Sequence, residues 1–497
     1  GTSSAGEGNV LLSDKVPGPE LALAMRGVEL WHELARDAAA GGGVEFEAKG
    51  GLLVAHDEDE LDALSVFARS QRELGVHVEL VGADALHELE PSLAEGLSGG
   101  AFYDEDCQVQ PMLAVDYLVR QFRAHGGRLV RGAGVVAAET DGQGNVRSVR
   151  TTRGTVAVGR CAVNAAGPWA REVAQCFGTD IPVEPRRGHV LVTEPLPPLL
   201  VRHKVCEAGY VGTVHDSITA RACSSVVEAT RSGTILLGSS REFVGFSPEL
   251  DLGIVRTIAA RGISLFPSLA GARLMRAYVG FRPTTPDRLP IIGADTRVGG
   301  LYHATGHEGA GIGLALVTAE LMDALVRDEA PPLDVTPFAP MRFTVAGRSP
   351  LSGHLPVELS GEVPGPEVPV RLGIPVAAER PPAPTRVTPS LTVPRPRGDG
   401  APPATSPLPQ LLHFRFDGRE LAAPWGTTIA GALLSNGERA WRTTRTGGQL
   451  RGLFCGIGTC FDCLVDVNGE KAVRACLAVL SEGDEIHSSA SVGLAGA

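Results

Sequence analysis

Apolar residues recur at helical spacing in three segments of the first third of the chain. Residues 17–40 begin with a proline and place Leu21 and Val28 on one face, which predicts an amphipathic helix. Residues 59–74 predict a second helix, and residues 111–125 predict a third that also begins with a proline. The pattern of the first region is therefore partly helical.

Shorter apolar runs bounded by turn-forming residues predict strands between and after these helices. The strands are expected at residues 44–55, 128–130, 161–167 and 301–304, together with a β-meander that turns at 141–142 and 153–154. Residues 180–290 are predicted to form mostly antiparallel strands. A glycine-rich stretch at 306–311 is expected to open a helix that runs to about residue 326.

Composition divides the chain into three regions. Residues 1–345 carry the mixed helical and strand pattern, and residues 410–497 form a small β-rich segment. Residues 346–409 contain 16 of the 36 prolines and almost no periodicity. Such a composition does not bury enough apolar surface to order itself, so we expect a semi-extended tether. A proline-rich ligand for another protein is the alternative interpretation.

Composition and charge limit the class of protein. With 43% hydrophobic and 21% charged residues the chain can bury a sizeable core, and a net charge of −12 argues against a nucleic-acid-binding surface. No run approaches the roughly 18 apolar residues of a membrane span, and residues 1–9 lack the features of a signal peptide. Because the sequence begins without Met, we expect a processed or partial chain.

The nine cysteines fall into two groups. Five are scattered, and we expect these to be small buried hydrophobes: Cys107, Cys161, Cys176, Cys206 and Cys223. The other four are Cys455, Cys460, Cys463 and Cys476, with the spacing C-x4-C-x2-C-x12-C. An odd total with one tight cluster predicts a metal site in a reducing cytosol rather than a disulfide scaffold.

The spacing of the first three clustered cysteines matches the loop of plant-type [2Fe–2S] proteins. Gly456 and Gly458 permit the backbone angles by which a short loop wraps a buried cluster, and their N–H groups can donate hydrogen bonds to sulfur. Zinc is the alternative, although structural zinc sites usually pair two C-x2-C units or include histidine. The sequence therefore favours a [2Fe–2S] cluster held by the four cysteines.

The residues around this cluster predict a small β-grasp ferredoxin. A hairpin is expected over 412–421, and Thr427 or Thr428 can cap the helix that follows. Through residues 455–463 and 474–477, the segment resembles the ferredoxin-like subunits and domains of bacterial amine and amino-acid dehydrogenases. Hydrogen cyanide synthase, opine oxidase and D-hydroxyproline dehydrogenase have such partners.

One glycine-rich fingerprint in the first region is rejected. Residues 132–137 read G-x-G-x-x-A and follow a predicted strand, as a dinucleotide-binding loop should. Residues 138–140, however, run directly into a turn rather than into a helix. We therefore do not expect a phosphate-binding loop at this place.

Six stretches of the first region keep the order and character of one enzyme family: 2–9, 163–169, 187–191, 238–243, 280–290 and 306–312. By these stretches the region resembles the D-amino-acid oxidase/glycine oxidase (DAO) superfamily of FAD-dependent oxidoreductases. The family's first βαβ unit, which carries a G-x-G-x-x-G loop, is missing from this sequence. The implied fold class is α/β plus α+β, with the β-grasp [2Fe–2S] domain following.

The resemblance also implies how the first region is divided. A Rossmann-like FAD-binding domain would consist of residues of about 1–43, 110–180 and 288–345. An antiparallel-sheet substrate domain would consist of residues of about 44–109 and 181–287.

The resemblance further implies the residues of the site. The residues expected to line the FAD are Thr2, Ser3, Ala5, Gly6, Glu7, Gly8, Asn9, Val135, Ala165, Ala166, Gly167, Gly306, His307, Gly309, Gly311 and Ile312. Arg282 would bind the substrate carboxylate, because a planar guanidinium pairs with both of its oxygens. His307 and Glu228 are polar neighbours for which we expect mainly structural roles.

The function expected from this resemblance is dehydrogenation of the C–N bond of a small amino or imino acid. Electrons would pass from FAD to the [2Fe–2S] cluster and on to a quinone or a carrier protein. Glycine, a D-amino acid, sarcosine, D-hydroxyproline and an opine all fit an arginine-anchored carboxylate. Alternatives are an electron-transfer and assembly subunit with an incomplete flavin site, and an oxidase that produces H₂O₂.

The resembled systems also imply partners and a location. They contain additional flavoprotein subunits, so we expect this chain to work within such an assembly. A cytoplasmic location is expected, with contact at the inner membrane through the electron acceptor.

Overall fold

The computed structural model describes residues 2–38, 43–197, 199–209, 211, 221–343, 411–444 and 448–489. The described residues up to 343 form one compact unit, and those from 411 onward form a second. The predicted proline-rich tether at 346–409 lies outside the described residues. No helix in the described part of the chain is both long and apolar enough to span a membrane.

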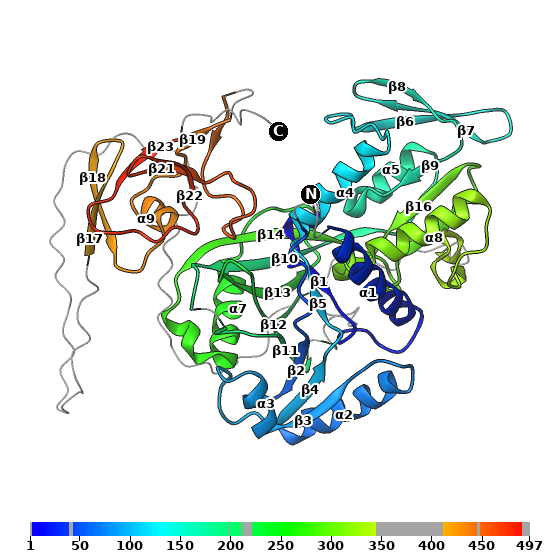
Figure 1. The fold of residues 1–497 in the computed structure, drawn as a ribbon. Coiled ribbons are helices and arrows are strands. Elements are labelled where there is room, and N and C mark those ends of the chain that lie inside the picture. The colour runs from blue at the N-terminus through cyan, green and yellow to red at the C-terminus, as the bar shows by residue number, and fades with distance from the viewer. Residues whose placement is uncertain are drawn as a thin grey trace. The chain divides into compact units, whose positions relative to one another are not determined.

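An eight-stranded sheet forms the centre of the first unit (Figure 1). Its strands, in spatial order, are β14 (Leu274–Thr284), β10 (Glu184–Thr193), β13 (Ile235–Glu242), β12 (Arg221–Ala229), β11 (Lys204–Glu207), β2 (Gly51–Ala55), β4 (Gly99–Tyr103) and β3 (Glu79–Gly82). Neighbours run antiparallel except β11 and β2, which run parallel. All eight strands come from residues 44–109 and 181–287, the ranges expected to form the substrate domain.

Three smaller sheets accompany the large one. They are β15 (Ile291–Ala294), β16 (Leu301–Thr305) and β9 (Ala162–Asn164); the meander β6 (Val135–Thr140), β7 (Val146–Thr151) and β8 (Gly154–Ala157); and the pair β1 (Asn9–Val10) and β5 (Cys107–Gln108). β9 and β16 run parallel, and their first paired positions, Ala162 and Leu301, lie 139 positions apart in the sequence. The meander confirms the rejection of residues 132–137 as a dinucleotide loop, because a strand follows instead of a helix.

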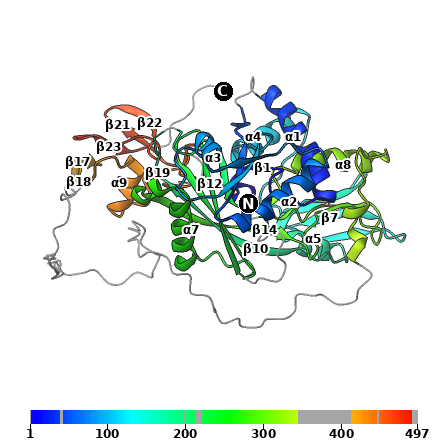
Figure 2. The same ribbon diagram turned by 90° about the horizontal axis from the view of Figure 1, so that it is seen from below.

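Helices pack around these sheets. They are α1 (Pro19–Ala38), α2 (Glu58–Arg72), α3 (Ala83–Leu89), α4 (Pro111–Ala124), α5 (Ala170–Cys176), α7 (Leu252–Leu265) and α8 (Ala315–Arg327). Figures 1 and 2 both show α1 beside α8. A Cβ atom on Gly27 of α1 would lie 2.6 Å from the carbonyl oxygen of Gly313, so glycine permits this close approach. Trp31 of α1 is fully buried and donates its indole N–H to Ile312 O at 3.0 Å.

Two local predictions were wrong. Residues 44–47 contribute only an isolated bridge at Glu47, and residues 128–130 form no strand. Leu129 and Val130 are about half exposed, so this apolar run has no buried face to pair. The segment 180–290 forms mostly antiparallel strands as predicted. It also contains α7, which Asp251 caps by accepting hydrogen bonds from the N–H groups of Gly253 and Ile254.

The second unit has the predicted hairpin and helix. Its sheet order is β18 (Arg419–Pro424), β17 (Leu411–Phe416), β23 (Glu485–Ser488), β21 (Leu464–Val467) and β22 (Glu470–Arg474). The central strands β17 and β23 run parallel, which gives the mixed sheet of a β-grasp fold. Helix α9 (Ile429–Ser435) begins at Thr428, whose hydroxyl accepts a hydrogen bond from Gly431 N. A short pair, β19 (Arg442–Thr443) and β20 (Leu450–Arg451), completes the unit.

A polar cluster, most of it buried, includes residues of the large sheet. Its members are Glu7, Lys49, Asp106, Lys204 and Glu228, and Lys49 and Lys204 are two of only four lysines in the chain. Glu228 on β12 is fully buried and next to Lys204 on β11. Burial raises the pKa of the Glu228 carboxyl to about 8; Lys49 opposes this rise and Glu7 adds to it.

Replacement of Glu228 by Gln should flatten the pH dependence of stability. The pKa of this carboxyl in the folded protein, about 8, lies above its ordinary value of 4.5, so the folded state keeps a proton that the unfolded chain releases. The free energy of unfolding therefore falls as pH rises between these values, by up to about 1.4 kcal/mol per pH unit. Urea unfolding at a series of pH values measures the slope.

The control for this experiment is Glu79→Gln on β3, where the side chain is exposed. That variant should keep the wild-type slope. If Glu228→Gln also kept it, Glu228 would not be the group that holds the proton.

Candidate functional site

A cavity of about 700 Å³ opens between the large sheet, the end of β9 and helix α8. Thirteen of the sixteen predicted cofactor residues line it: Thr2, Ser3, Ala5, Gly6, Glu7, Gly8, Asn9, Ala165, Gly167, His307, Gly309, Gly311 and Ile312. Arg282 lines it as well, whereas Val135, Ala166 and Gly306 do not. The structure therefore brings together residues from both ends of the first unit.

The N-terminal segment forms one wall of the cavity. Residues Thr2–Ala5 form the 3-10 helix η1, and the hydroxyl of Thr2 donates to Phe281 O on β14 at 2.9 Å. A Cβ atom on Gly280 would lie 2.8 Å from the Cβ of Ala5, so the two backbones meet here. Gly8 has a φ of +100°, and a side chain there would overlap the carbonyl of Val109. Small residues thus leave the backbone of this wall open to a ligand.

The end of β9 forms a second wall, and a buried hydrogen-bond chain fixes it. Asn164 Nδ2 donates to Nδ1 of His303 at 3.2 Å, and Nε2 of His303 donates to Asp295 at 3.1 Å. Asn164 also accepts from Ala166 N at 3.3 Å, which fixes the turn that carries Ala165 and Gly167. The side chains of His303 and Asp295 are fully buried, so this polar chain determines where β9 ends relative to β16.

The turn after β16 forms a third wall. Gly306 has a φ of +79°, and a Cβ atom there would lie 2.7 Å from Thr285, so glycine permits the backbone to pack closely at this turn. The residues after it form the 3-10 helix η5 (Glu308–Ala310), so α8 begins only at Ala315 and not directly at the glycine stretch as predicted. His307 is hydrogen-bonded through Nε2 to Thr318 at 2.9 Å. Burial lowers its pKa to about 4, which keeps the imidazole neutral near pH 7.

A cluster of charged side chains occupies the end of the cavity beside this turn. Glu308 Oε1 lies 3.4 Å from Arg241 Nε, 3.7 Å from Arg186 Nη1 and 4.0 Å from Arg282 Nε. Burial alone would raise the pKa of Glu308, but Arg241, Arg282 and Arg186 outweigh it and lower the pKa to about 2. Glu308 is therefore ionised near pH 7.

The sequence analysis missed several lining residues. Arg241 and Glu308 lie within family-like stretches that were quoted as motifs, but nothing in their local pattern distinguished them from surface charges. Cys161, expected to be a small buried hydrophobe, is only partly buried and lines the cavity. Glu228 does not line it and belongs to the polar cluster around Lys49 and Lys204.

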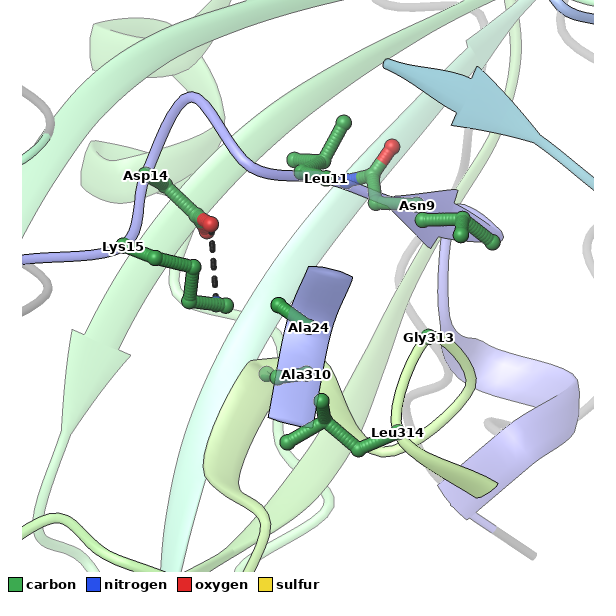
Figure 3. A pocket seen from close by; sticks show the side chains of 10 residues that line it. Asn9, Leu11, Asp14, Lys15, Ala24, Ala310, Gly313 and Leu314 are labelled. Carbon is green, nitrogen blue, oxygen red and sulfur yellow. Dashed lines mark ion pairs between the residues drawn. The ribbon is translucent and has the colours of Figure 1, made fainter. Parts of the chain in front are cut away.

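A second, much smaller cavity of about 20 Å³ lies between residues 9–15 and the turn 309–314 (Figure 3). Asp14 and Lys15 point toward each other at its edge, with 2.8 Å between Asp14 Oδ1 and Lys15 Nζ. Ala24 of α1 and Ala310 line it as well. Its volume suits a single water molecule, so an organic ligand belongs to the larger cavity.

The larger cavity fits an organic cofactor. Its volume falls within the range of small-molecule and cofactor sites, and its N-terminal wall consists largely of glycine, alanine and exposed backbone. Glu7 Oε1 and Asn9 Oδ1 are buried acceptor atoms without a hydrogen-bond partner among the described residues. Both residues line the cavity, so hydroxyl or N–H groups of a ligand can satisfy them.

The four clustered cysteines of the second unit form two close pairs. A hydrogen bond links the side chains of Cys455 and Cys460, and another links Cys463 and Cys476. No three of these four sulfur atoms, all in the described part of the chain, lie within 4.8 Å of one another. Around a single zinc ion all four would lie about 3.8 Å apart, given Zn–S bonds of about 2.3 Å. Two pairs fit a cluster of two iron atoms better.

The loop around these cysteines has the predicted conformation. Gly456 and Gly458 have φ values of +77° and +79°, and a side chain on Gly458 would contact Leu477. The N–H groups of Thr459 and Cys460 donate to Cys455 Sγ at 3.3 and 3.4 Å. The hydrogen bond from Cys460, with these backbone donors, outweighs burial and lowers the pKa of Cys455 to about 5. The side-chain hydrogen bonds raise the pKa of Cys460 and Cys476 in turn, so one thiol of each pair ionises more readily than its partner.

Comparison with protein families agrees with both sites. Residues 1–325 match the family model of the FAD dependent oxidoreductases (DAO), and residues 410–491 match that of the 2Fe-2S iron-sulfur cluster binding domain. The cofactors of the chain are accordingly FAD and a [2Fe–2S] cluster. This outcome confirms the predicted family and cofactors.

Curated relatives match the first region. Hydrogen cyanide synthase subunit HcnC of Pseudomonas aeruginosa is 30% identical over 325 residues, which are 65% of this chain and 74% of the relative. Glycine oxidase of Pseudomonas putida is 26% identical over 320 residues, covering 64% of this chain and 82% of that protein.

A solved structure shows the same fold. Glycine oxidase from Geobacillus kaustophilus superposes with a TM-score of 0.62 and 26% identity, covering 69% of this chain and 89% of that one. L-proline dehydrogenase from P. horikoshii, 20% identical with a TM-score of 0.60, supports the fold alone. The mixed α/β fold class is thereby confirmed. The chain belongs to the FAD dependent oxidoreductase (DAO) family and carries a C-terminal 2Fe-2S iron-sulfur cluster binding domain.

Proposed function

We propose that the chain oxidises the C–N bond of a small amino or imino acid as a dehydrogenase, and that the electrons leave through its own [2Fe–2S] domain. The observation that carries this proposal is the position of Arg282, which lines the same cavity as the predicted cofactor residues. Relatives named glycine oxidase and D-amino acid dehydrogenase support an amino-acid substrate. The iron–sulfur domain supports a one-electron acceptor.

Arg282 is the residue that anchors the substrate carboxylate. Its Nη1 donates to the carbonyl oxygen of Ser240 at 2.8 Å, so the guanidinium reaches from β14 across β10 to β13. Gly188 on β10 permits this position, because any side chain there would overlap the guanidinium. The anchor is therefore rigid, and a rigid anchor orients the Cα–H bond of a bound amino acid.

The reaction needs orientation more than acid–base groups. A hydride leaves the carbon and a proton leaves the nitrogen, which gives an imine that water converts to an oxo acid and an amine. Bound FAD supplies the acceptor for the hydride. The chain supplies no cationic acid at the turn after β16, since His307 is neutral and Glu308 is ionised. These two side chains therefore do not protonate a substrate amine that is bound in its neutral form.

The second unit supplies the exit for electrons. Cys455, Cys460, Cys463 and Cys476 would hold the cluster, which accepts one electron at a time. A quinone or a carrier protein is the acceptor that we propose. We also propose a cytoplasmic location within a larger flavoprotein assembly, a proposal supported by the relative whose name describes it as a subunit.

Anaerobic bleaching of the flavin by a panel of amines tests this function. Glycine, sarcosine, D-alanine, D-hydroxyproline and an opine should be compared on the purified chain, and at least one should bleach the flavin. A chain that shows cluster absorption without flavin absorption would instead be an electron-transfer subunit. Rapid reoxidation of the flavin by O₂ would identify an oxidase.

Substitution Arg282→Met should raise the KM for the amine roughly 10- to 100-fold. This factor corresponds to the free energy lost with one charge-assisted hydrogen bond. Flavin content should not change, because the fold of the N-terminal wall does not use this side chain. Arg276→Met is the matched control: it lies on the same strand, stacks on Tyr278 and is not among the cavity residues. Unaltered kinetics in Arg282→Met would remove Arg282 from the site.

Substitution Cys460→Ser should abolish electron transfer to a one-electron acceptor but spare flavin reduction by substrate. The physical reason is that a cluster with one thiolate replaced is lost or altered, whereas the cavity lies in the first unit. Stopped-flow absorbance separates the two steps. Cys206→Ser, a buried cysteine outside the cluster, is the control. Loss of both steps in Cys460→Ser alone would contradict the proposed order of electron transfer.

A further inference from the structure

The polar cluster that contains Glu228 reaches from the cavity toward the molecular surface. Glu7 lines the cavity, whereas Glu47 lies at the surface with 26% of its side chain exposed. Both carboxylates act on Glu228, because each raises its pKa. The charged neighbours of Glu228 are Glu7 from the N-terminal segment, Lys49 and Glu47 from the segment before β2, and Lys204 from β11. A buried carboxyl is thus placed within electrostatic reach of both ends.

The Glu7 carboxylate forms the cavity end of this route. Asn9 Nδ2 donates to Glu7 Oε2 at 3.2 Å, which orients the carboxylate. Glu7 Oε1 lies against the backbone of Gly238 on β13, where any side chain would overlap it. Oε1 is a buried acceptor of a residue that lines the cavity, so the N–H group of a bound amine can donate to it.

The sheet register brings Glu228 to the face on which Glu7 lies. Gly238 of β13 pairs with Val226 of β12, and directly paired residues of antiparallel strands point to one face. Residues two positions apart on a strand also share a face, so Glu228 points to the same side as Val226. The two carboxylates therefore lie on one side of the sheet, over the same pair of strands.

Lys49 connects Glu228 to the surface. Its Nζ donates to Ala229 O at 2.6 Å, next to Glu228 in the chain, and lies 3.7 Å from Glu47 Oε2. Glu47 Oε1 is in turn 3.5 Å from Nε of the exposed Arg231. Burial raises the pKa of Glu228 to about 8 and Lys49 opposes this rise, so both forms of the carboxyl are accessible near neutral pH.

We propose that this route carries the nitrogen proton of the substrate from the cavity to solvent, with Glu7 as its first acceptor and Glu228 as the relay. A substrate ammonium gives one proton to the Glu7 carboxylate and becomes the neutral amine that loses a hydride from carbon. Glu228 passes its own proton toward Glu47 and solvent and takes the proton from Glu7 in its place, with water bridging the buried carboxylates.

One proton leaves the substrate and one enters solvent, and no group of the route is oxidised or reduced. This inference rests on the proposed function and adds the fate of the nitrogen proton. Glu7 touches the substrate in this assignment, whereas Glu228 acts through Glu7.

The pH dependence of flavin bleaching tests the relay. Anaerobic stopped-flow absorbance compares the wild-type protein with Glu7→Gln and Glu228→Gln, using the amine of the panel that bleaches the wild-type flavin fastest. Near pH 7 each variant should bleach roughly 100-fold more slowly, the usual effect of a lost acid–base group. Above the pKa of the substrate ammonium the amine arrives neutral, so both variants should approach the wild-type rate.

Proton release provides a second measurement. A pH indicator in weakly buffered solution should report release in step with bleaching in the wild-type protein and delayed release in Glu47→Gln. Glu228→Asp keeps a carboxyl group and should restore much of the rate that Glu228→Gln loses. Glu79→Gln, on the exposed side of β3, is the control and should match the wild type. If Glu228→Gln failed to fold, Glu7→Gln and Glu47→Gln would decide the outcome.

Infrared spectroscopy of the resting protein gives a readout without turnover. A protonated-carboxyl band near neutral pH should be lost in Glu228→Gln and retained in Glu79→Gln; a band that persists in Glu228→Gln would overturn the relay. Gln variants of Glu7 and Glu228 that bleach as fast as the wild type, or are slowed equally at every pH, would also overturn it and leave the dehydrogenase function intact. If no amine bleached the wild-type flavin at any pH, the dehydrogenase function itself would be contradicted.

Discussion

The carboxylate of Glu308 pairs with three arginines, Arg186, Arg241 and Arg282, at one end of the large cavity. Three guanidinium groups from neighbouring strands would repel one another across the sheet without it, and its pKa of about 2 shows how strongly they hold its negative charge. The residue has a φ of +47°, an uncommon conformation for a residue other than glycine. The ion pairs thus stabilise a turn that the backbone alone disfavours, and the same turn carries His307 and Gly309 into the cavity.

The large sheet fixes the relative positions of the residues around this turn. β10 and β14 pair along almost their whole length, so Arg282, Gly188 and the N-terminal segment keep fixed relative positions. At another wall of the cavity, a series of side-chain hydrogen bonds from Asn164 through His303 to Asp295 fixes β9 against β16. Elements far apart in sequence meet here because buried polar groups need specific partners.

Much of the molecule could be predicted from the sequence where the pattern is local. Helices α1, α2 and α4, the hairpin around Asp417 and the Thr428 cap each depend on a few neighbouring residues, and all were placed within a few positions. The cysteine spacing was equally informative, because it determines which thiolates a short loop can bring together. The predicted cofactor residues came from the family resemblance, and thirteen of the sixteen line one cavity.

The rest depends on long-range contacts that no local pattern reveals. Arg241, Glu308 and Arg186 are ordinary charged residues in the sequence, and only the pairing of strands makes them neighbours. Helix α7 was hidden because its β-branched and glycine residues resemble those of the flanking strands. Val135 was expected near the adenine, but its strand belongs to the outlying meander, and it does not line the cavity.

The two cysteine pairs differ in what brings them together. Cys455 and Cys460 belong to one loop, whereas Cys463 and Cys476 stand at the two ends of the β21–β22 hairpin, next to the registered pair Leu464 and Arg474. A nascent chain can present the first pair early, but the second exists only after the hairpin has closed. Maturation of the cofactor is therefore tied to the closure of this hairpin, and mutations that loosen the hairpin should reduce iron content without altering any ligand.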